Sequence, residues 1–310
     1  MNKKNYLIEK AEKGLTIQQY LKQIAGFSNA QIRSMKFTEN GICLGGQRAR
    51  VTTRLSEGDV LEVLLETKNS SSAHLLSFEQ MPDILYEDAD VIAVNKPAGM
   101  AVHPSHGHYQ DTLANQLAYY FRKNTQQVEI HSIGRLDLET SGIVLFAKHR
   151  AAAARLSRQR EDGRLQKTYL AICSGIFAEK NGTLNGAIAP LPGSLMKMCV
   201  SKDGKPAVTH YQVQKQYMEA ALVQLTLETG RTHQIRVHMA DAGHPLIGDR
   251  LYFADTDQKA DVDAENCFTG IKRAALHASR ICFYQPFEGK RITVEAPFPE
   301  DMKKCLFRDE

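Results

Sequence analysis

One carboxylate stands out in this sequence because of the residues around it. Asp137 lies in the string GRLDLETSG, which covers residues 134–142 and leads directly into the apolar run Ile143–Ala147. A buried strand fixes the loop that enters it, so a carboxylate at this point could be held in position for chemistry. An aspartate in a turn also commonly caps the chain or pairs with a cation. The spacing alone leaves both interpretations open.

Other polar strings accompany this loop in a fixed order. They are VNKPAGMAVHP at 94–104, KTYLA at 167–171, TGRTHQIRVHM at 229–239 and GHPLIGD at 243–249. Together with GRLDLETSG, this set resembles the RluA-type pseudouridine synthases. The resemblance extends over about residues 82–300 and predicts an enzyme that isomerises uridine in RNA.

The resemblance implies a role for three residues of the active site. Asp137 matches the catalytic aspartate, which attacks the sugar or the base of the target uridine or promotes a glycal route. Arg236 matches the arginine that pairs with it, and an adjacent cation stabilises the ionised form of a carboxylate. Tyr169 matches the tyrosine that stacks on the target base, as an aromatic ring can do with any flipped pyrimidine.

Further residues of these strings are expected to contact RNA. Arg135 matches a residue that enters the RNA stack when the target nucleotide is extruded, although a phosphate contact is an equal alternative. Arg231 and His233 are expected to shape the pocket or to touch phosphate. The chain departs from many family members at Gly134, where those proteins carry histidine.

The N-terminal segment predicts a small separate module. Ile17, Tyr20, Leu21 and Ile24 share one helical face, and residues 30–35 predict a second helix capped by Ser28 or Asn29. Short strands follow, with a Gly-Gly hairpin turn after residues 41–44 and a closing strand over 60–64.

This order is similar to the S-four-like RNA-binding domain. The resemblance covers about residues 12–65, although Ser28-Asn29 stands where such domains usually have Ser-Arg. It implies phosphate contacts by basic residues of the second helix and the hairpin, which here are Arg33, Lys36, Arg48 and Arg50.

Charge and composition fit this division. Residues 1–65 contain ten of the 39 Lys and Arg residues and six of the 35 Asp and Glu residues, so the remainder holds 29 of each. The whole excess of positive charge therefore lies in the N-terminal segment, which suits contact with a polyanion, although a solvated surface explains it equally well. The Ser-rich stretch near residue 70 predicts a linker. We expect an RNA-binding domain over 1–65, a linker over 66–80 and a catalytic domain over 81–310.

The catalytic segment alternates short apolar runs with turns. Its helical candidates are Thr112–Phe121 and Arg150–Gln159, and strands dominate elsewhere. We therefore expect an α+β fold with a mixed, largely antiparallel sheet, beside a small N-terminal α/β domain.

Several other classes of protein and site are disfavoured. His103, His106 and His108 could suggest a metal site, but no thiol or further carboxylate completes the cluster before Asp111. The sequence contains no phosphate-binding Gly-rich motif, and its six cysteines form no Cys-x-x-Cys pair. It also has neither a secretory signal nor an apolar run of bilayer length. We expect a cytoplasmic monomer that binds RNA and uses no cofactor and no metal.

The leading hypothesis is a pseudouridine synthase that modifies large-subunit ribosomal RNA and thereby takes part in rRNA processing. The alternatives are a synthase acting on transfer RNA, a non-catalytic RNA-binding assembly factor, and a metal-dependent hydrolase of RNA. Chelators would abolish activity only in the last case.

Overall fold

The N-terminal part forms a small sheet covered by two helices. The computed structural model describes residues 3–65, 72, 75–105, 107–126, 128–253 and 271–306. The first elements are β1 (Lys3–Leu7), the 3-10 helix η1 (Lys10–Glu12), α1 (Ile17–Gln23), α2 (Asn29–Phe37), β2 (Ile42–Leu44), β3 (Gln47–Arg48) and β4 (Val60–Leu64). Their antiparallel sheet has the order β1-β4-β2-β3. The predicted small α/β domain is confirmed.

Local chemistry explains why these elements begin and end where they do. Thr16 and Ser28 each accept a hydrogen bond from the backbone three residues on, and each forms a capping box with a glutamine. Gly45 and Gly46 both have positive φ, as a tight two-residue hairpin turn requires, and they join β2 to β3. The predicted helices and hairpin are therefore confirmed.

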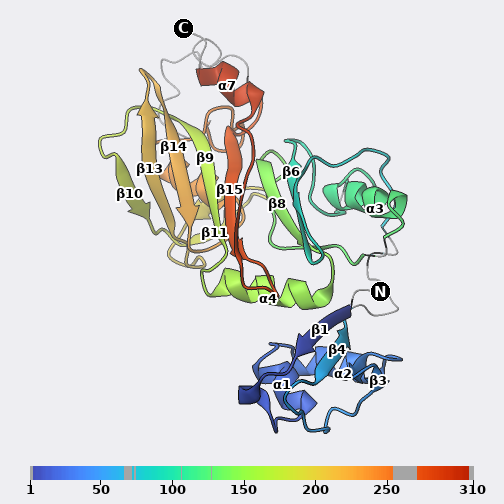
Figure 1. Cartoon of the computed structure of the whole chain (residues 1–310). Helices are drawn as coiled ribbons and strands as arrows, with labels where there is room; N and C mark the ends of the chain where they lie inside the picture. Colours follow the sequence, from blue (N-terminus) through green and yellow to red (C-terminus); the bar gives the residue numbers. More distant parts are fainter. Residues whose placement is uncertain are drawn as a thin grey trace.

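The rest of the chain builds a large sheet flanked by helices (Figure 1). Its elements are β5 (Ile84–Glu87), β6 (Val91–Lys96), α3 (Leu113–Lys123), β7 (His131–Ser132), β8 (Ser141–Ala147), α4 (Arg150–Glu161), β9 (Gln166–Ser174), β10 (Asn181–Leu184), β11 (Ile188–Pro190), β12 (Met198–Val200), β13 (Thr209–Gln216), β14 (Ala220–Leu227), α5 (Gln234–Asp241), β15 (Leu276–Tyr284), β16 (Arg291–Glu295) and α7 (Glu300–Leu306).

The large sheet has the order β10-β13-β14-β9-β15-β8-β6-β5, with β16 and β7 attached to β15 and β8. Every pairing among these strands is antiparallel except β15 with β8, which is parallel. The prediction of a mixed, largely antiparallel sheet is confirmed.

Strand β8 is buried along its whole length because both faces of the sheet are covered. Val144 and Phe146 pack into a core cluster that includes α3, whereas Ile143 and Leu145 pack into a second cluster that includes α4. The loop that carries Asp137 enters this strand. The strand therefore anchors that loop in the middle of the sheet.

Most of the predicted linker lies outside the described residues. Ser72 accepts a hydrogen bond from the backbone N–H of Ile130, and Leu75 belongs to the core cluster around α3. The domain limits at 65 and 81 remain predictions.

Within the described residues, every helix is too short or too polar to cross a membrane.

Candidate active site

The loop between β7 and β8 carries Asp137, whose side chain is about one-third exposed. The backbone N–H of Thr140 donates to the carbonyl of Asp137 at 3.1 Å, which closes a tight turn. The next carbonyl, that of Leu138, accepts from the N–H of Gly99 at 2.9 Å. The loop is thus held both by its own turn and by the segment that follows β6.

Lys96 lies at the end of β6 and is completely buried. Its ammonium group donates to the carbonyls of Leu138, Pro97 and Met100 at 2.7–3.0 Å. Burial lowers the pKa of Lys96 to about 7, and the negative charge of Asp137 opposes that shift. Lys96 therefore fastens the loop that carries Asp137 to the end of β6.

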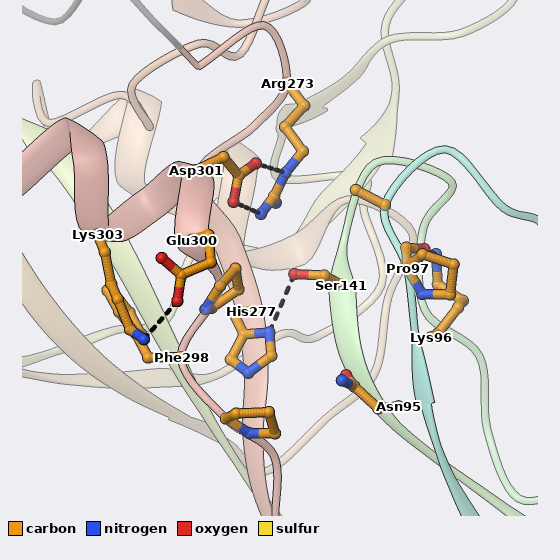
Figure 2. A pocket seen from close by; sticks show the side chains of 13 residues that line it. Asn95, Lys96, Pro97, Ser141, Arg273, His277, Phe298, Glu300, Asp301 and Lys303 are labelled. Carbon is orange, nitrogen blue, oxygen red and sulfur yellow. Dashed lines mark hydrogen bonds and ion pairs between the residues drawn. The ribbon is translucent and has the colours of Figure 1, made fainter. Parts of the chain in front are cut away.

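A second clamp comes from the segment before β15. Arg273 donates to the carbonyl of Glu139 at 3.3 Å and pairs with Asp301 at 2.7 Å. The N–H of Ala274 donates to the carboxylate of Glu139 at 3.1 Å. Figure 2 shows Arg273 and its partner Asp301 in a pocket that Ser141 and Lys96 also line. Strands on both sides of β8 thus restrain the loop.

Arg236 approaches Asp137 from α5. Its Nη1 lies 4.0 Å from the Asp137 carboxylate, and its Nη2 lies 3.9 Å from that of Glu139. The structure therefore brings together the predicted pair of Asp137 and Arg236. The closer partner is Asp249, which accepts two hydrogen bonds of 2.7 Å from Arg236 and is itself fully buried.

Electrostatics at Arg236 follow from this arrangement. Burial lowers the pKa of Arg236, but the hydrogen bonds and negative charge of Asp249 outweigh burial and leave the pKa raised. The charges of Asp137 and Glu139 act in the same direction. Arg236 is therefore a permanent cation that faces three carboxylates.

Tyr169 lies in the middle of the sheet, on β9, opposite Leu225 of β14 and Ala278 of β15. Its side chain is buried, and burial raises its pKa, as does the negative charge of Asp137 to a smaller extent. The phenol is consequently neutral at physiological pH, and the charge of Asp137 acts on it.

His233 and Tyr252 complete this side of the site. His233 caps α5 in the left-handed conformation, with φ of 56°, and its Nδ1 is hydrogen-bonded to the Tyr252 hydroxyl at 2.8 Å. Burial lowers the pKa of His233, an effect that the charge of Asp137 opposes. The guanidinium of Arg236 lies 5.1 Å from the centre of the Tyr252 ring. These contacts support the expectation that His233 shapes the pocket.

The remaining predicted RNA contacts have different surroundings. Arg135 is exposed on the loop that carries Asp137. Arg231 is also exposed, but its Nε donates to the carbonyl of Pro206 at 3.0 Å. The other four lie exposed on or next to α2 and β3 of the small sheet; they are Arg33, Lys36, Arg48 and Arg50.

The histidine cluster has conventional hydrogen-bond partners. His103 bonds to Ser132 at 2.7 Å, and His108 bonds to Asp111 at 2.7 Å. His106 lies outside the described residues. Among the residues that the structure describes, no group of three or more His, Cys, Asp or Glu side chains is arranged to hold a metal ion.

Sequence reasoning missed the residues that orient the predicted ones. Asp249 stands in the string GHPLIGD and Lys96 in VNKPAGMAVHP. The resemblance rests on both strings but gives neither side chain a role. Glu139 follows Asp137 by two residues, and Tyr252 follows Asp249 by three. The sequence does contain a signal for Asp249 and Lys96, because each is a charged residue beside apolar ones. A buried charge requires specific partners.

Comparison with known proteins agrees with this geometry. The family described as RNA pseudouridylate synthase matches residues 90–241. An RNA pseudouridine synthase of Bacillus subtilis, YjbO, is 36% identical over 293 residues, which cover 94% of this chain and 98% of that protein. The ribosomal large subunit pseudouridine synthase D of Neisseria meningitidis serogroup A is 38% identical over 267 residues, which cover 85% of this chain and 67% of that protein.

A solved structure supports the fold independently. The human RNA pseudouridylate synthase domain containing 1 superposes with a TM-score of 0.56 at 27% identity and covers 77% of this chain and 90% of its own. Identity over nearly the full length of a relative, the family match and the shared fold lead to one conclusion. The chain belongs to the RluA-type family of RNA pseudouridine synthases, which are intramolecular isomerases.

Proposed function

We propose that this synthase uses Asp137 as its catalytic carboxylate and modifies uridines of large-subunit ribosomal RNA. The observation that carries the assignment of Asp137 is its position. The carboxylate projects from a loop clamped by Lys96 and Arg273, 4.0 Å from the buried cation Arg236. A nearby cation keeps a carboxylate ionised, as all three chemical routes require.

The reaction breaks the bond between the sugar and N1 of uracil, rotates the base and joins C5 to the same sugar carbon. N1 gains a proton, and C5 loses one when the new bond has formed. The ring of Tyr169 borders the carboxylate and offers a flat face for the detached base. Arg135, exposed on the same loop, is available to occupy the gap left by the extruded nucleotide.

The substrate is proposed from the relatives. Proteins named ribosomal large subunit pseudouridine synthase D from four genera are 35–38% identical to this chain over most of its length. The small N-terminal domain with its exposed basic residues supports binding of a structured RNA. Transfer RNA is the competing substrate and is one outcome of the test below.

The test measures tritium released from C5-labelled uridine in unmodified transcripts of large-subunit ribosomal RNA and of transfer RNA. The intact protein is compared with Asp137→Asn, with and without a chelator. We expect release from ribosomal RNA that survives the chelator and falls to background in the variant. Glu139→Gln, which alters the neighbouring carboxylate, serves as the matched control and should retain measurable release.

Each part of the proposal can fail separately. Release from transfer RNA alone would reject the ribosomal substrate but keep Asp137 as the catalytic residue. Full activity of Asp137→Asn would reject the catalytic assignment. Binding of both RNAs without release from either would favour an RNA-binding factor, and loss of release with chelator would favour metal-dependent chemistry.

A further inference from the structure

Arg155 projects from α4 toward the small N-terminal sheet, and its side chain is half-buried. Its guanidinium lies beside two aromatic rings, 5.2 Å from the centre of the Phe27 ring and 4.0 Å from that of Phe287, and the two ring centres are 6.3 Å apart. Its Nη1 donates to the carbonyl of Pro286 at 2.6 Å. Phe27 follows α1, whereas Phe287 lies in the turn between β15 and β16. One side chain therefore joins the two sheets, on either side of α4 in Figure 1.

Other elements of the small domain make contacts at the same place. Lys4 of β1 lies 4.9 Å from the centre of the Phe287 ring, and Gln31 of α2 donates to the carbonyl of Arg150 at 3.3 Å. The positive charge of Arg155 lowers the pKa of Tyr6, also in β1, against the larger raising effect of burial. A strand, a helix and the turn after α1 thus all contact the catalytic part.

The packing at this contact is apolar as well as charged. Ala151 of α4 is a buried member of the core cluster of the small domain, and Phe287 packs against that cluster. The core of the N-terminal domain is therefore completed by residues of the catalytic part. Burial of shared apolar surface favours one fixed arrangement over many loose ones.

Buried hydrogen bonds hold the catalytic side of the contact rigid. Gln285 accepts from the N–H groups of Phe287 and Glu288, and its amide donates to Asp90. The carboxylate of Asp90 also bonds to His149, the N-cap of α4, at 2.8 Å. The ring of Phe287 and the start of α4 are consequently fixed relative to each other.

An arginine suits this position for a specific reason. A planar guanidinium stacks on aromatic rings and still donates hydrogen bonds from its edge, whereas an ammonium group cannot do both.

We propose that Arg155 is a positioning residue that locks the N-terminal domain onto the catalytic domain, so that the enzyme reads RNA at two rigidly spaced surfaces. One surface contains Asp137 and Arg135, and the other contains the basic residues of α2 and β3. Two sites held at a fixed distance bind a matching RNA much more tightly than either site alone, and they reject RNAs of the wrong shape. The RNA contacts in this inference rest on the proposed function. The fixed contact between the two domains does not depend on it.

The first test measures the lock without RNA. Small-angle X-ray scattering of the intact chain should give one compact particle for the unsubstituted protein. We expect a larger maximum dimension for Arg155→Met, and also for Arg155→Lys, which keeps the charge but loses the planar fork. Arg158→Met changes an exposed arginine on the same helix and should leave the scattering unchanged.

The second test separates positioning from catalysis. Tritium release is measured on the full ribosomal transcript and on a hairpin of about 20 nucleotides cut around the uridine that the enzyme modifies. We expect Arg155→Lys and Arg155→Met to raise KM for the transcript about tenfold with little change in kcat. Their kcat/KM on the hairpin should equal that of Arg158→Met, because a hairpin reaches only the catalytic surface.

The results have distinct meanings. Unchanged scattering in both Arg155 variants would overturn the lock, and so would an equal rise in KM on the hairpin and the transcript. If the unsubstituted protein released no tritium from ribosomal RNA, the proposed substrate would fail. The scattering would still decide whether Arg155 fixes the two domains.

Discussion

The guanidinium of Arg236 is shared unequally among three carboxylates. Asp249 takes two short hydrogen bonds, whereas Asp137 and Glu139 lie at about 4 Å. Asp249 also accepts N–H groups of Leu251 and Tyr252, so its own orientation is fixed. Arg236 is thus aimed by a buried partner, and Asp137 stays free enough to meet a substrate.

Asp249→Asn tests this orientation. The amide keeps the shape of the carboxylate but removes its charge and one acceptor, and a buried pair that loses a partner typically costs about 3–5 kcal/mol. We expect the single-turnover rate of tritium release to fall about 100-fold, with RNA affinity little changed. Urea denaturation measures the loss of stability, and rapid-quench assays measure the rate of tritium release. A variant that lost stability but kept its rate would show that Asp249 only supports the fold.

At this scale, resemblance in sequence could name Asp137, Tyr169 and Arg236, because each stands in a recognisable string. It could not rank the partners of Arg236. Asp137 and Asp249 are both carboxylates in strings of the same resemblance, and only the folded structure shows that Asp249 is the nearer acceptor, at 2.7 Å against 4.0 Å.

At the scale of elements, the parallel pairing of β8 with β15 is the critical junction. It consists of Ser141 opposite His277 and Gly142 opposite Ala278. Gly142 has φ of 106°, and an added Cβ would lie 2.3 Å from the carbonyl oxygen of Ala278. The strand that leads out of the Asp137 loop therefore approaches its neighbour as closely as only glycine permits.

Gly142→Ala should consequently be severely destabilising. Backbone strain and the clash with Ala278 together cost about 3 kcal/mol or more. Thermal or urea denaturation measures the loss, and tritium release should fall with it. Gly163→Ala is the control, because Gly163 also has positive φ but an added Cβ meets nothing within 4 Å. Equal losses in the two variants would contradict the steric explanation.

His277 makes the same junction sensitive to acid. Its Nδ1 is hydrogen-bonded to Ser141 at 3.0 Å, as Figure 2 shows. Burial, together with the nearby charge of Arg273, lowers the pKa of His277 to about 4 from 6.5. Between these values the unfolded chain binds more protons than the folded chain, so the stability contributed by neutral His277 is lost as pH falls.

The expected size of this effect is about 1.4 kcal/mol for each pH unit. The unsubstituted protein should therefore lose about 2 kcal/mol relative to His277→Asn between pH 7 and pH 5. Urea denaturation at the two pH values measures the difference. Parallel pH profiles of the two proteins would rule out His277 as the titrating group.

Most helices and hairpins could be predicted locally. The caps Thr16 and Ser28, the turn Gly45-Gly46 and the alternation of apolar runs act within a few residues. The β8–β15 pairing joins residues 136 positions apart. No local pattern encodes that partnership, because parallel strands need only be buried, and many runs in this chain satisfy that condition.

At the scale of the whole molecule, charged residues are distributed unevenly between the two parts of the chain. Exposed basic residues of α2 and β3 stand apart from the acidic surroundings of Arg236. On the proposed function, attraction to phosphates is expected to act mainly through the small domain.

Arg48→Gln combined with Arg50→Gln tests this division. Each phosphate contact that is lost should reduce the slope of log K against log salt concentration by about 0.7–0.9. Filter-binding titrations over a range of salt concentrations measure the slope. Lys10→Gln combined with Lys13→Gln removes equal charge from η1 and the turn after it. An equal change in slope for both pairs would mean that binding follows net charge and not these positions.

The contacts that hold the Asp137 loop also determine the order in which parts of the chain can fold during translation. Residues 3–65 supply most of their own core, which Ala151 and Phe287 complete, so this part can begin to fold while the rest of the chain is still being translated. The loop with Asp137 must wait for Arg273, Ala274 and Asp301 to emerge from the ribosome. The exposed basic residues of α2 and β3 are therefore in place well before the second restraint on the Asp137 loop can form. Until residue 301 has been made, Arg273 lacks its partner Asp301, and that restraint stays incomplete.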